Sequence, residues 1–379
     1  MKLQEALKDD IFNLPIERTN YFPSHLETIY SRYIDLLSSV KGKYADAVKL
    51  HLTEISSTCT NILEISKLIL DGRSIQAYKK LDDLFNQIED FLVPPASKNV
   101  IVPNNHFFYF KARESDGTHF KRDDMFHVPF EKRYSVQTNR FSVPGLPCIY
   151  LANSAYTCWE ELGRPQLSKL YVSAFKEHRV NLKFLDLTPT AIELTKWHLS
   201  MKGTKAKRFR SEIFIENHLK RSLLLHPLLI ACYTRVQDPN ATFKPEYILP
   251  QLLMQWVVTH DHLHGIEYLS TRSLAVTKPT YGNMEKAINY ALPVRNVSET
   301  GYCKTLTSYL KLTEPLSWEL LNIKKPNFLN DITTSTKTYD YNRYEIQLDA
   351  SGAIPYWESA FGYIEKELRC MELLPLSST

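Results

Sequence analysis

The fold of this chain is decided by the stretch NRFSVPGLPCIYLANS, residues Asn139–Ser154. Its central prolines and glycine are typical of a turn. The apolar run Cys148–Ala152 is too short for a helix and predicts a buried strand. Asn153 or Ser154 then offers an N-cap for a helix that carries Glu160 and Glu161. We therefore expect a turn, a strand and a helix to bring an arginine, a tyrosine and a carboxylate to one cleft.

Length and composition favour an ordinary globular protein of two domains. The chain has 379 residues, of which 44% are hydrophobic and 23% are charged, and its net charge is +4. Domains of about 100–200 residues are the rule, so two fit this length. So small a positive excess does not suggest a nucleic-acid-binding protein or a membrane-surface protein.

The cysteines favour a reducing compartment. Six of them lie scattered, with no C-x-x-C pair, and several occupy apolar runs. A free thiol in such a run behaves as a small hydrophobic side chain. The first residues show no apolar segment typical of a signal peptide, and no run approaches the ~18 apolar residues of a membrane span. We expect a cytoplasmic protein without a membrane partner.

The N-terminal part reads as an all-α domain over residues 1–96. Ser24 and Glu27 have the spacing of a capping box and predict a helix start. A second helix is expected from about 44 to 70, and a third after Ser74, ended by Pro94-Pro95. The third helix carries a narrow apolar seam, which favours packing within the chain or, alternatively, a dimer contact: Ala77, Leu81, Leu84, Ile88 and Phe91. A linker is expected over residues 94–105.

After the linker, strand and helix signals mix without a regular alternation, which favours an α+β fold over a doubly wound sheet. We predict helices at 191–200, 211–225 and 247–258. Strands are predicted at residues 106–113, 170–172, 184–187, 228–232 and 265–270. Neither G-x-G-x-x-G nor G-x-x-x-x-G-K-[ST] occurs, so the common nucleotide-binding loops are absent from the sequence. Residues 97–379 are expected to form the second domain.

Several motifs of this second domain occur in a recognisable order. They are Lys111-Ala112-Arg113, Arg140-Phe141-Ser142-x-x-Gly145-x-Pro147-x-x-Tyr150-Leu151, Glu161, Glu246–Leu253 and Gly265-Ile266-x-Tyr268-x-Ser270. Together they resemble the RES domain, which is named for an arginine, a glutamate and a serine. A helical domain ahead of a RES domain is also a familiar arrangement. The resemblance covers about residues 105–275, and the C-terminal segment around 363–368 fits only loosely.

The resemblance implies a fold similar to the ADP-ribosyltransferases and an enzyme that consumes NAD. Members of the family act as toxins or defence effectors that split NAD between nicotinamide and ribose, by hydrolysis or phosphorolysis, and others transfer ADP-ribose to a protein. NAD is then the substrate, and no cofactor is expected. An antitoxin or defence-trigger protein and a homo-oligomer are the expected partners.

The site residues follow by position in the motifs. The resemblance implies Glu161, Arg113 and Ser270 as catalytic residues, and the NAD-binding residues are Lys111, Arg113, Arg140, Tyr150 and Ser270. Glu161 is preferred to Glu160 because its spacing from Tyr150 and the following Leu162 match the family. Relatives often carry an arginine where this chain has Lys111, and lysine lacks the two-pronged guanidinium contact.

These residue types suit the chemistry. Expelling nicotinamide leaves positive charge on the ribose, as in glycoside cleavage, and a carboxylate such as Glu161 stabilises that charge. Guanidinium groups clasp a pyrophosphate through paired hydrogen bonds. Tyr150 suits stacking on nicotinamide, and Ser270 suits a bond to ribose or nicotinamide. The plain alternatives are an exposed helix carboxylate, surface arginines, a core tyrosine and a serine that caps a turn.

Three further signals are weaker. The run His260–His264 places alternate histidines on one side of an extended chain but lacks further ligands for a metal site, so no metal is expected. The basic residues of 202–210 suit a solvated loop or a contact with phosphate, a partner or RNA. Arg18 and His25 have the spacing of HEPN ribonucleases, but Pro23 interrupts them.

The leading interpretation is an NAD glycohydrolase or phosphorylase that acts as a toxin. One alternative is an ADP-ribosyltransferase that modifies a macromolecule, since water, phosphate and a macromolecule attack the same ribose carbon. Another is a non-catalytic interaction module whose helical domain recruits partners.

Overall fold

The computed structural model describes residues 1–42, 44–93, 107–188, 205–272, 287–324, 345–349 and 352–376. The chain divides into two compact units. One comprises Met1–Ser97, Asn139–Phe141 and Leu185–His260. The other comprises Lys98–Thr138, Ser142–Phe184 and Asp261–Thr379. The domain boundary expected after residue 96 lies one residue from the end of the first segment of the helical unit, at Ser97. Residues 185–260 were expected in the second domain but group with the N-terminal helices.

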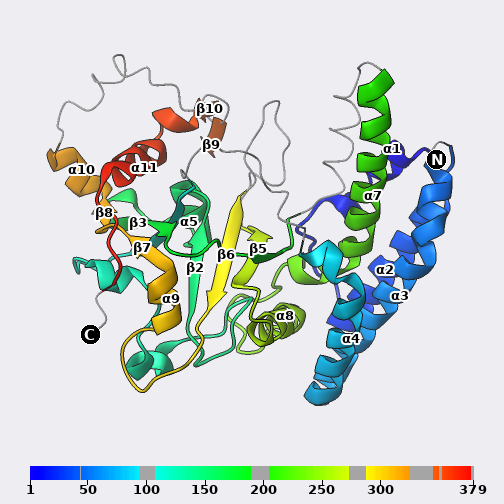
Figure 1. Cartoon of the computed structure of the whole chain (residues 1–379), viewed down its shortest axis with the longest axis horizontal. Coiled ribbons are helices and arrows are strands. Elements are labelled where there is room, and N and C mark those ends of the chain that lie inside the picture. The colour runs from blue at the N-terminus through cyan, green and yellow to red at the C-terminus, as the bar shows by residue number, and fades with distance from the viewer. Residues whose placement is uncertain are drawn as a thin grey trace. The chain divides into compact units, whose positions relative to one another are not determined.

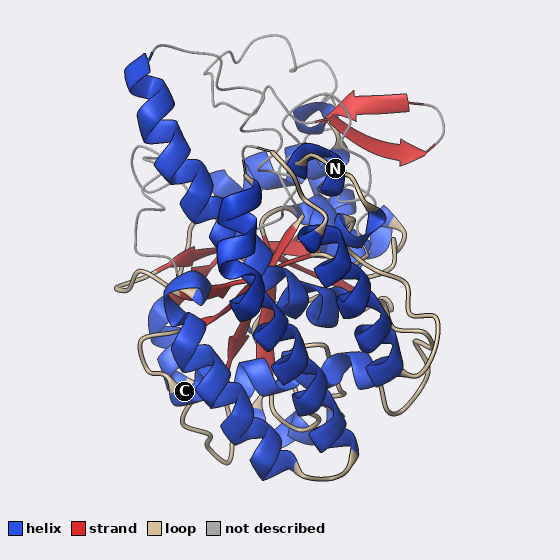
Figure 2. Ribbon diagram, turned by 90° about the vertical axis from the view of Figure 1, so that its right-hand side faces the viewer, coloured by secondary structure: helices blue, strands red, loops and turns tan. Residues whose placement is uncertain are grey.

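The first unit is built from helices that pack side by side (Figure 1; Figure 2, helices in blue). Helix α3 packs against α2, α4 and α7, and α8 packs against α3, α4 and α7. The elements are α1 (Leu3–Ala6), η1 (Asp10–Phe12), α2 (Phe22–Ser38), α3 (Ala45–Leu70), α4 (Ser74–Leu92), α7 (Lys205–Tyr233), η5 (Pro245–Tyr247) and α8 (Ile248–Thr259). None of the described helices combines the length and apolarity needed to cross a membrane.

The apolar seam of α4 is covered by its own chain. Ala77, Leu81, Leu84 and Ile88 are buried within the unit, and Phe91, the last residue of the seam, is half-buried. The helix contacts α3, α7 and α8. Packing inside the chain is therefore what the structure shows for this seam. The expected linker 94–105 and the helix expected at 191–200 lie outside the described residues.

The capping box expected at Ser24 was wrong. Helix α2 begins at Phe22, with Pro23 in its first turn, so Ser24 is already helical. Its backbone oxygen accepts a 2.9 Å hydrogen bond from the Thr28 hydroxyl. Proline is favoured at a helix start because its φ is preset and it lacks an N–H that would be unpaired there. Pro23 therefore begins the helix earlier than the spacing of Ser24 and Glu27 suggested.

The strand predicted at 228–232 was also wrong, because these residues continue helix α7 beyond Pro227. A proline inside a helix leaves the carbonyl four residues earlier, that of Leu223, without its N–H donor. The Tyr33 hydroxyl donates to this oxygen at 2.8 Å, and the Tyr30 hydroxyl donates to the Pro227 oxygen at 2.8 Å. Tertiary hydrogen bonds from α2 thus stabilise a helix that the local sequence interrupts.

The second unit contains an eight-stranded sheet in the order β4-β5-β6-β2-β1-β3-β7, with β8 also paired to β3. A separate pair joins β9 (Glu345–Asp349) and β10 (Gly352–Pro355). The strands of the large sheet are β1 (Tyr109–Glu114), β2 (Cys148–Ala152), β3 (Leu170–Glu177), β4 (Phe184–Asp186), β5 (Gly265–Leu269), β6 (Ile288–Pro293), β7 (Leu310–Leu312) and β8 (Leu316–Ser317). The strands predicted at 148–152, 170–172, 184–187 and 265–270 are confirmed.

Side chains alternate between the two faces of this sheet, and each face has its own core. Phe110, Val172 and Ala174 join a cluster with α5 (Ala155–Glu161) and α11 (Ala360–Cys370). Tyr109 and Phe175 join another cluster, which includes Phe126, Phe130 and Leu306 of α9 (Lys304–Tyr309). Helices, strands and mixed connections make the structure α+β, as expected.

The register of the central strands matters for the site. Strand β1 pairs with β3 at six positions, from Tyr109–Phe175 to Glu114–Leu170. It pairs with β2 at Phe110–Ala152. Strands β2 and β6 pair from Cys148–Pro293 to Ala152–Asn289. Strands β1 and β2 therefore join at one paired position, and each pairs along the rest of its length with a different strand.

Candidate active site

Helix α5 carries the glutamate predicted as catalytic. Ser154 is its N-cap, because the Ser154 hydroxyl oxygen accepts a hydrogen bond from the Thr157 N–H at 3.1 Å. The choice between Asn153 and Ser154 is thus settled in favour of serine. Glu161 is the last residue of the helix. Consecutive helix residues point about 100° apart, so Glu160 and Glu161 face different surroundings.

The Glu161 carboxylate accepts two short hydrogen bonds on its Oε1 atom. Ser270 Oγ donates at 2.6 Å and Asn289 Nδ2 donates at 2.6 Å. Ser270 follows β5 and Asn289 lies in β6, where it pairs with Tyr268. Both donors are almost fully buried. Hydrogen bonds to an ionised acceptor are stronger than those between neutral groups. The Glu161 carboxylate therefore joins the end of α5 to Ser270 after β5 and to Asn289 in β6.

Close pairing of β5 and β6 needs glycine at position 265. A Cβ atom there would lie 2.4 Å from the Ala291 backbone oxygen. No side chain fits at that distance, so the glycine of the Gly265-Ile266-x-Tyr268-x-Ser270 motif lets the two strands approach. This approach sets the relative position of Ser270 and Asn289.

Glu160 has a different environment. Its side chain is buried, and it forms a 2.8 Å ion pair with Arg164 four residues later. Burial raises the pKa of the Tyr156 hydroxyl, and the neighbouring Glu160 raises it further. The structure thus gives Glu160 a partner in the turn that follows its helix, Arg164, and gives Glu161 partners from the sheet.

Arg272 contacts two of the three residues predicted as catalytic, Glu161 and Ser270, although the sequence reasoning missed it. Its backbone N–H donates to Ser270 Oγ at 3.2 Å, and its Nη1 donates to the backbone oxygen of Glu161 at 2.7 Å. A cation at the C-terminal end of a helix also interacts favourably with the helix dipole. Asn289 was missed as well, since a single asparagine in a strand carries no sequence signal.

Lys111 and Arg113 form a second group. Arg113 Nη1 donates to the Asp124 oxygen at 2.6 Å, and the guanidinium lies 4.3 Å from the Phe120 ring centre. Lys111 Nζ donates to the Phe126 oxygen. Burial lowers the pKa of Lys111 to about 8, and the nearby Arg113 charge acts in the same direction. These hydrogen bonds lead to 124–126 rather than to the carboxylate of Glu161.

Tyr150 and Arg140 lie in separate surroundings. The Tyr150 hydroxyl and Ser142 Oγ are 2.9 Å apart. Arg140 belongs to the helical unit, where its Nη1 donates to the oxygens of Cys232 at 2.6 Å and Thr234 at 3.2 Å. A basic side chain at the last carbonyls of a helix is a common C-cap, here of α7. The structure therefore brings Glu161 and Ser270 together. It places Lys111 and Arg113 near each other, and Arg140 belongs to the helical unit.

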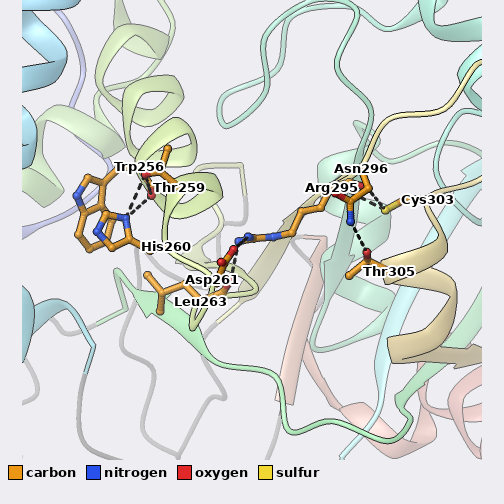
Figure 3. Close-up of polar contacts among 9 residues, drawn as sticks. All are labelled: Trp256, Thr259, His260, Asp261, Leu263, Arg295, Asn296, Cys303 and Thr305. Carbon is orange, nitrogen blue, oxygen red and sulfur yellow. Dashed lines mark hydrogen bonds and ion pairs between the residues drawn. The ribbon is translucent and has the colours of Figure 1, made fainter.

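The histidines of 260–264 are engaged in local contacts. The His260 ring stacks on Trp256 at 3.9 Å and its Nδ1 lies 2.7 Å from the Trp256 oxygen. His264 Nδ1 accepts from the Lys183 N–H at 2.9 Å. Figure 3 shows His260 against Trp256 and, separately, Arg295 reaching Asp261 and Leu263. Among the described residues, no group of three or more potential ligands gathers for a metal ion.

The pair that suggested a ribonuclease has other contacts. Arg18 Nε lies 3.0 Å from the buried Glu246 carboxylate. His25 is buried in α2, and burial lowers its pKa, with a further contribution from Arg18. The side chains of the basic run 202–210 lie outside the part that the structure describes.

The chain is similar to a Bacillus subtilis protein named "Putative toxin YopC". The two are 34% identical over 358 residues, which cover 89% of this chain and 77% of that protein. No protein-family model matches the chain, and no solved structure matches it. At this identity and coverage, the chain belongs to the family of that Bacillus subtilis protein.

Proposed function

We propose that the chain is an NAD-degrading enzyme of the RES type, a glycohydrolase or phosphorylase that acts as a toxin. The observation that carries the proposal is the contact of Glu161 with Ser270. The two residues were chosen separately from motifs 109 positions apart, and a 2.6 Å hydrogen bond joins them. A glutamate that served only as an exposed surface residue of the helix would not be hydrogen-bonded to a buried serine and a buried asparagine.

In the proposed reaction, the bond between nicotinamide and the ribose carbon breaks and its electron pair leaves with neutral nicotinamide. The ribose gains positive charge, which the Glu161 carboxylate stabilises. Both bonds from Ser270 and Asn289 end on Oε1. The Oε2 atom is then the one to meet the ribose. A nucleophile, water or phosphate, adds to the same carbon and completes the cleavage.

The basic residues are proposed to bind the pyrophosphate. Arg113 and Lys111 have N–H donors held by backbone carbonyls, and phosphate oxygens are stronger acceptors for them. Tyr150 lies on β2, and its ring is proposed to stack on nicotinamide. The single paired position between β1 and β2 supports an ADP-ribosyltransferase-like fold, which we propose for the second unit.

The toxin role rests on the family. The name of the Bacillus subtilis relative describes a toxin. A toxin that degrades NAD needs restraint in its own cell, so we propose an antitoxin or a defence trigger as a partner. We also propose cytoplasmic action on the cellular NAD pool and a homo-oligomer.

The test is an incubation of purified protein with NAD, with and without phosphate and with cell extract, followed by chromatography of the products. ADP-ribose would identify a hydrolase, and ADP-ribose carrying a new phosphate a phosphorylase. ADP-ribose attached to extract protein would identify the transferase alternative. Absence of nicotinamide release under all three conditions would contradict the proposal.

A further inference from the structure

The C-terminal helix α11 carries a buried carboxylate, Glu365, that contacts the start of α5, the helix that ends in Glu161. Glu365 is only 4% exposed. Its Oε1 accepts hydrogen bonds from the Ala155 N–H at 2.7 Å and from the Tyr356 hydroxyl at 2.5 Å. Ala155 is the first residue of α5. A carboxylate from 210 positions away therefore fixes the start of this helix.

Tyr356 strengthens the connection. Its hydroxyl oxygen accepts from the Tyr156 N–H at 3.5 Å while its proton goes to Glu365. Two successive N–H groups of the first turn, those of Ala155 and Tyr156, are thus held by the C-terminal segment. These groups have no acceptor inside the helix, because the first N–H groups of any helix lack one. The negative charge of Glu365 also suits the positive end of the helix dipole.

Apolar contacts hold the same two helices. The Phe361 ring lies 5.4 Å from the ring of Tyr156 and 5.2 Å from that of Trp159. At the far end of α5, Glu161 meets Ser270 and Asn289. From Ala155 to Glu161 the helix rises about 9 Å, at about 1.5 Å per residue. So short a helix moves as one body, and a shift at Ala155 reaches Glu161.

We propose that Glu365 is a positioning residue for Glu161, assisted by Tyr356. The carboxylate holds the start of α5 and thereby sets the Glu161 side chain on Ser270 and Asn289. The C-terminal segment 356–369, which the motifs of the catalytic domain do not reach, then belongs to the active unit. This inference rests on the proposed function for its catalytic consequence, whereas the connection itself can be tested without any activity.

The structural test is amide hydrogen exchange of the full-length protein. Glu365→Ala and Tyr356→Phe are compared with Glu358→Ala, whose glutamate lies exposed in the same segment. Exchange in peptides covering 155–162 is expected to speed up in the first two variants and to stay unchanged in the third. Exchange in β7, whose Leu310 and Leu312 belong to the core on the other face of the sheet, is expected to stay unchanged in all of them. Equal exchange of α5 in wild type and both variants would overturn the inference.

The catalytic test measures NAD cleavage by the same proteins. Displacement of Glu161 in Glu365→Ala is expected to lower kcat on the order of 10- to 100-fold, because misplacement by about 1 Å has effects of that size. KM is expected to change little, and Glu365→Gln, which keeps an acceptor oxygen, is expected to recover part of kcat. Unchanged kcat in Glu365→Ala would overturn the positioning role. If wild type itself cleaves no NAD, the proposed function fails, while hydrogen exchange still decides the connection.

Discussion

The Ser270 hydroxyl donates a 2.6 Å hydrogen bond to Glu161 Oε1, and Asn289 donates a second bond to the same oxygen. The carboxylate is thus oriented by two buried side chains from neighbouring strands. Orientation by fixed donors leaves little freedom for the carboxylate, which we propose faces the ribose of NAD.

Removing one of the two donors is expected to slow NAD cleavage. A hydrogen bond to a charged group contributes about 1.5–3 kcal/mol, so Ser270→Ala is expected to lower kcat by about 10- to 160-fold. Asn289→Ala is expected to act similarly, and KM should change little, because the interaction serves the chemical step. Steady-state kinetics of both variants check this. An increase in KM at unchanged kcat would show that the two residues bind substrate instead.

Lys111 is expected to make stability depend on pH. Its pKa is lowered to about 8 by burial and by Arg113. The unfolded chain therefore binds more protons than the folded chain between about pH 8 and the usual lysine pKa of about 10.5, and stability rises with pH in that window.

Lys111→Met removes this titration. The free energy of unfolding, measured with urea, is expected to rise from pH 8 to pH 10 more in wild type than in the variant. Lys121→Met, at an exposed lysine, serves as control and should follow wild type. Parallel pH profiles of wild type and Lys111→Met would contradict the expectation.

His127 is expected to weaken the fold in acid. Its Nδ1 lies 2.7 Å from the Val128 oxygen and its Nε2 lies 2.8 Å from the Cys303 N–H, which fits a neutral ring that donates at Nδ1 and accepts at Nε2. Burial, with a contribution from Lys111, lowers the pKa to about 4. Between about pH 6.5 and 4 the unfolded chain binds more protons, so stability falls as pH falls through this window.

The variant His127→Gln can both donate and accept but does not titrate. Its unfolding free energy is expected to fall less than that of wild type between pH 6.5 and 4, by up to about 3 kcal/mol, at 1.36 kcal/mol per pKa unit. His262→Gln, at an exposed histidine, is the control. An equal loss of stability in wild type and His127→Gln would refute this role.

Tyr33 is expected to stabilise the helix across Pro227. Tyr33→Phe leaves the Leu223 oxygen buried without a donor, at a cost of about 1–3 kcal/mol in the free energy of unfolding. Tyr30→Phe is the matched control, because its acceptor, the Pro227 oxygen, can still accept the helical N–H four residues later. Chemical denaturation of both variants checks the difference. An equal effect of the two substitutions would count against this explanation.

Local signals predicted local structure well. The strand 148–152 and the cap at Ser154 were confirmed, because a short apolar run and a capping side chain act within a few residues. The strand at 228–232 was wrong because its fate depends on Tyr33 and Tyr30, about 190 positions away. An apolar run after a proline has the same sequence pattern whether it forms a strand or continues a helix.

The site was only partly visible in the sequence. Glu161 and Ser270 were found through motifs that resemble the RES domain, and periodicity alone would not have joined them. Asn289, Arg272 and Glu365 were missed because each acts through one long-range hydrogen bond that leaves no pattern in the chain. The contacts of Arg140 could not be predicted from the sequence either. They lie at the end of α7, and the sequence did not show that residues 185–260 group with the N-terminal helices.

The most direct measurement is the rate of nicotinamide release from NAD by wild type, Glu161→Gln and Glu160→Gln. The two substitutions are adjacent and chemically identical, and each keeps a side chain able to hydrogen-bond. We expect release by wild type, loss of about 100-fold or more in Glu161→Gln, as for removal of a key electrostatic group, and a near wild-type rate in Glu160→Gln. A wild-type rate in Glu161→Gln, or loss in Glu160→Gln alone, would contradict the assignment of Glu161 as the catalytic carboxylate.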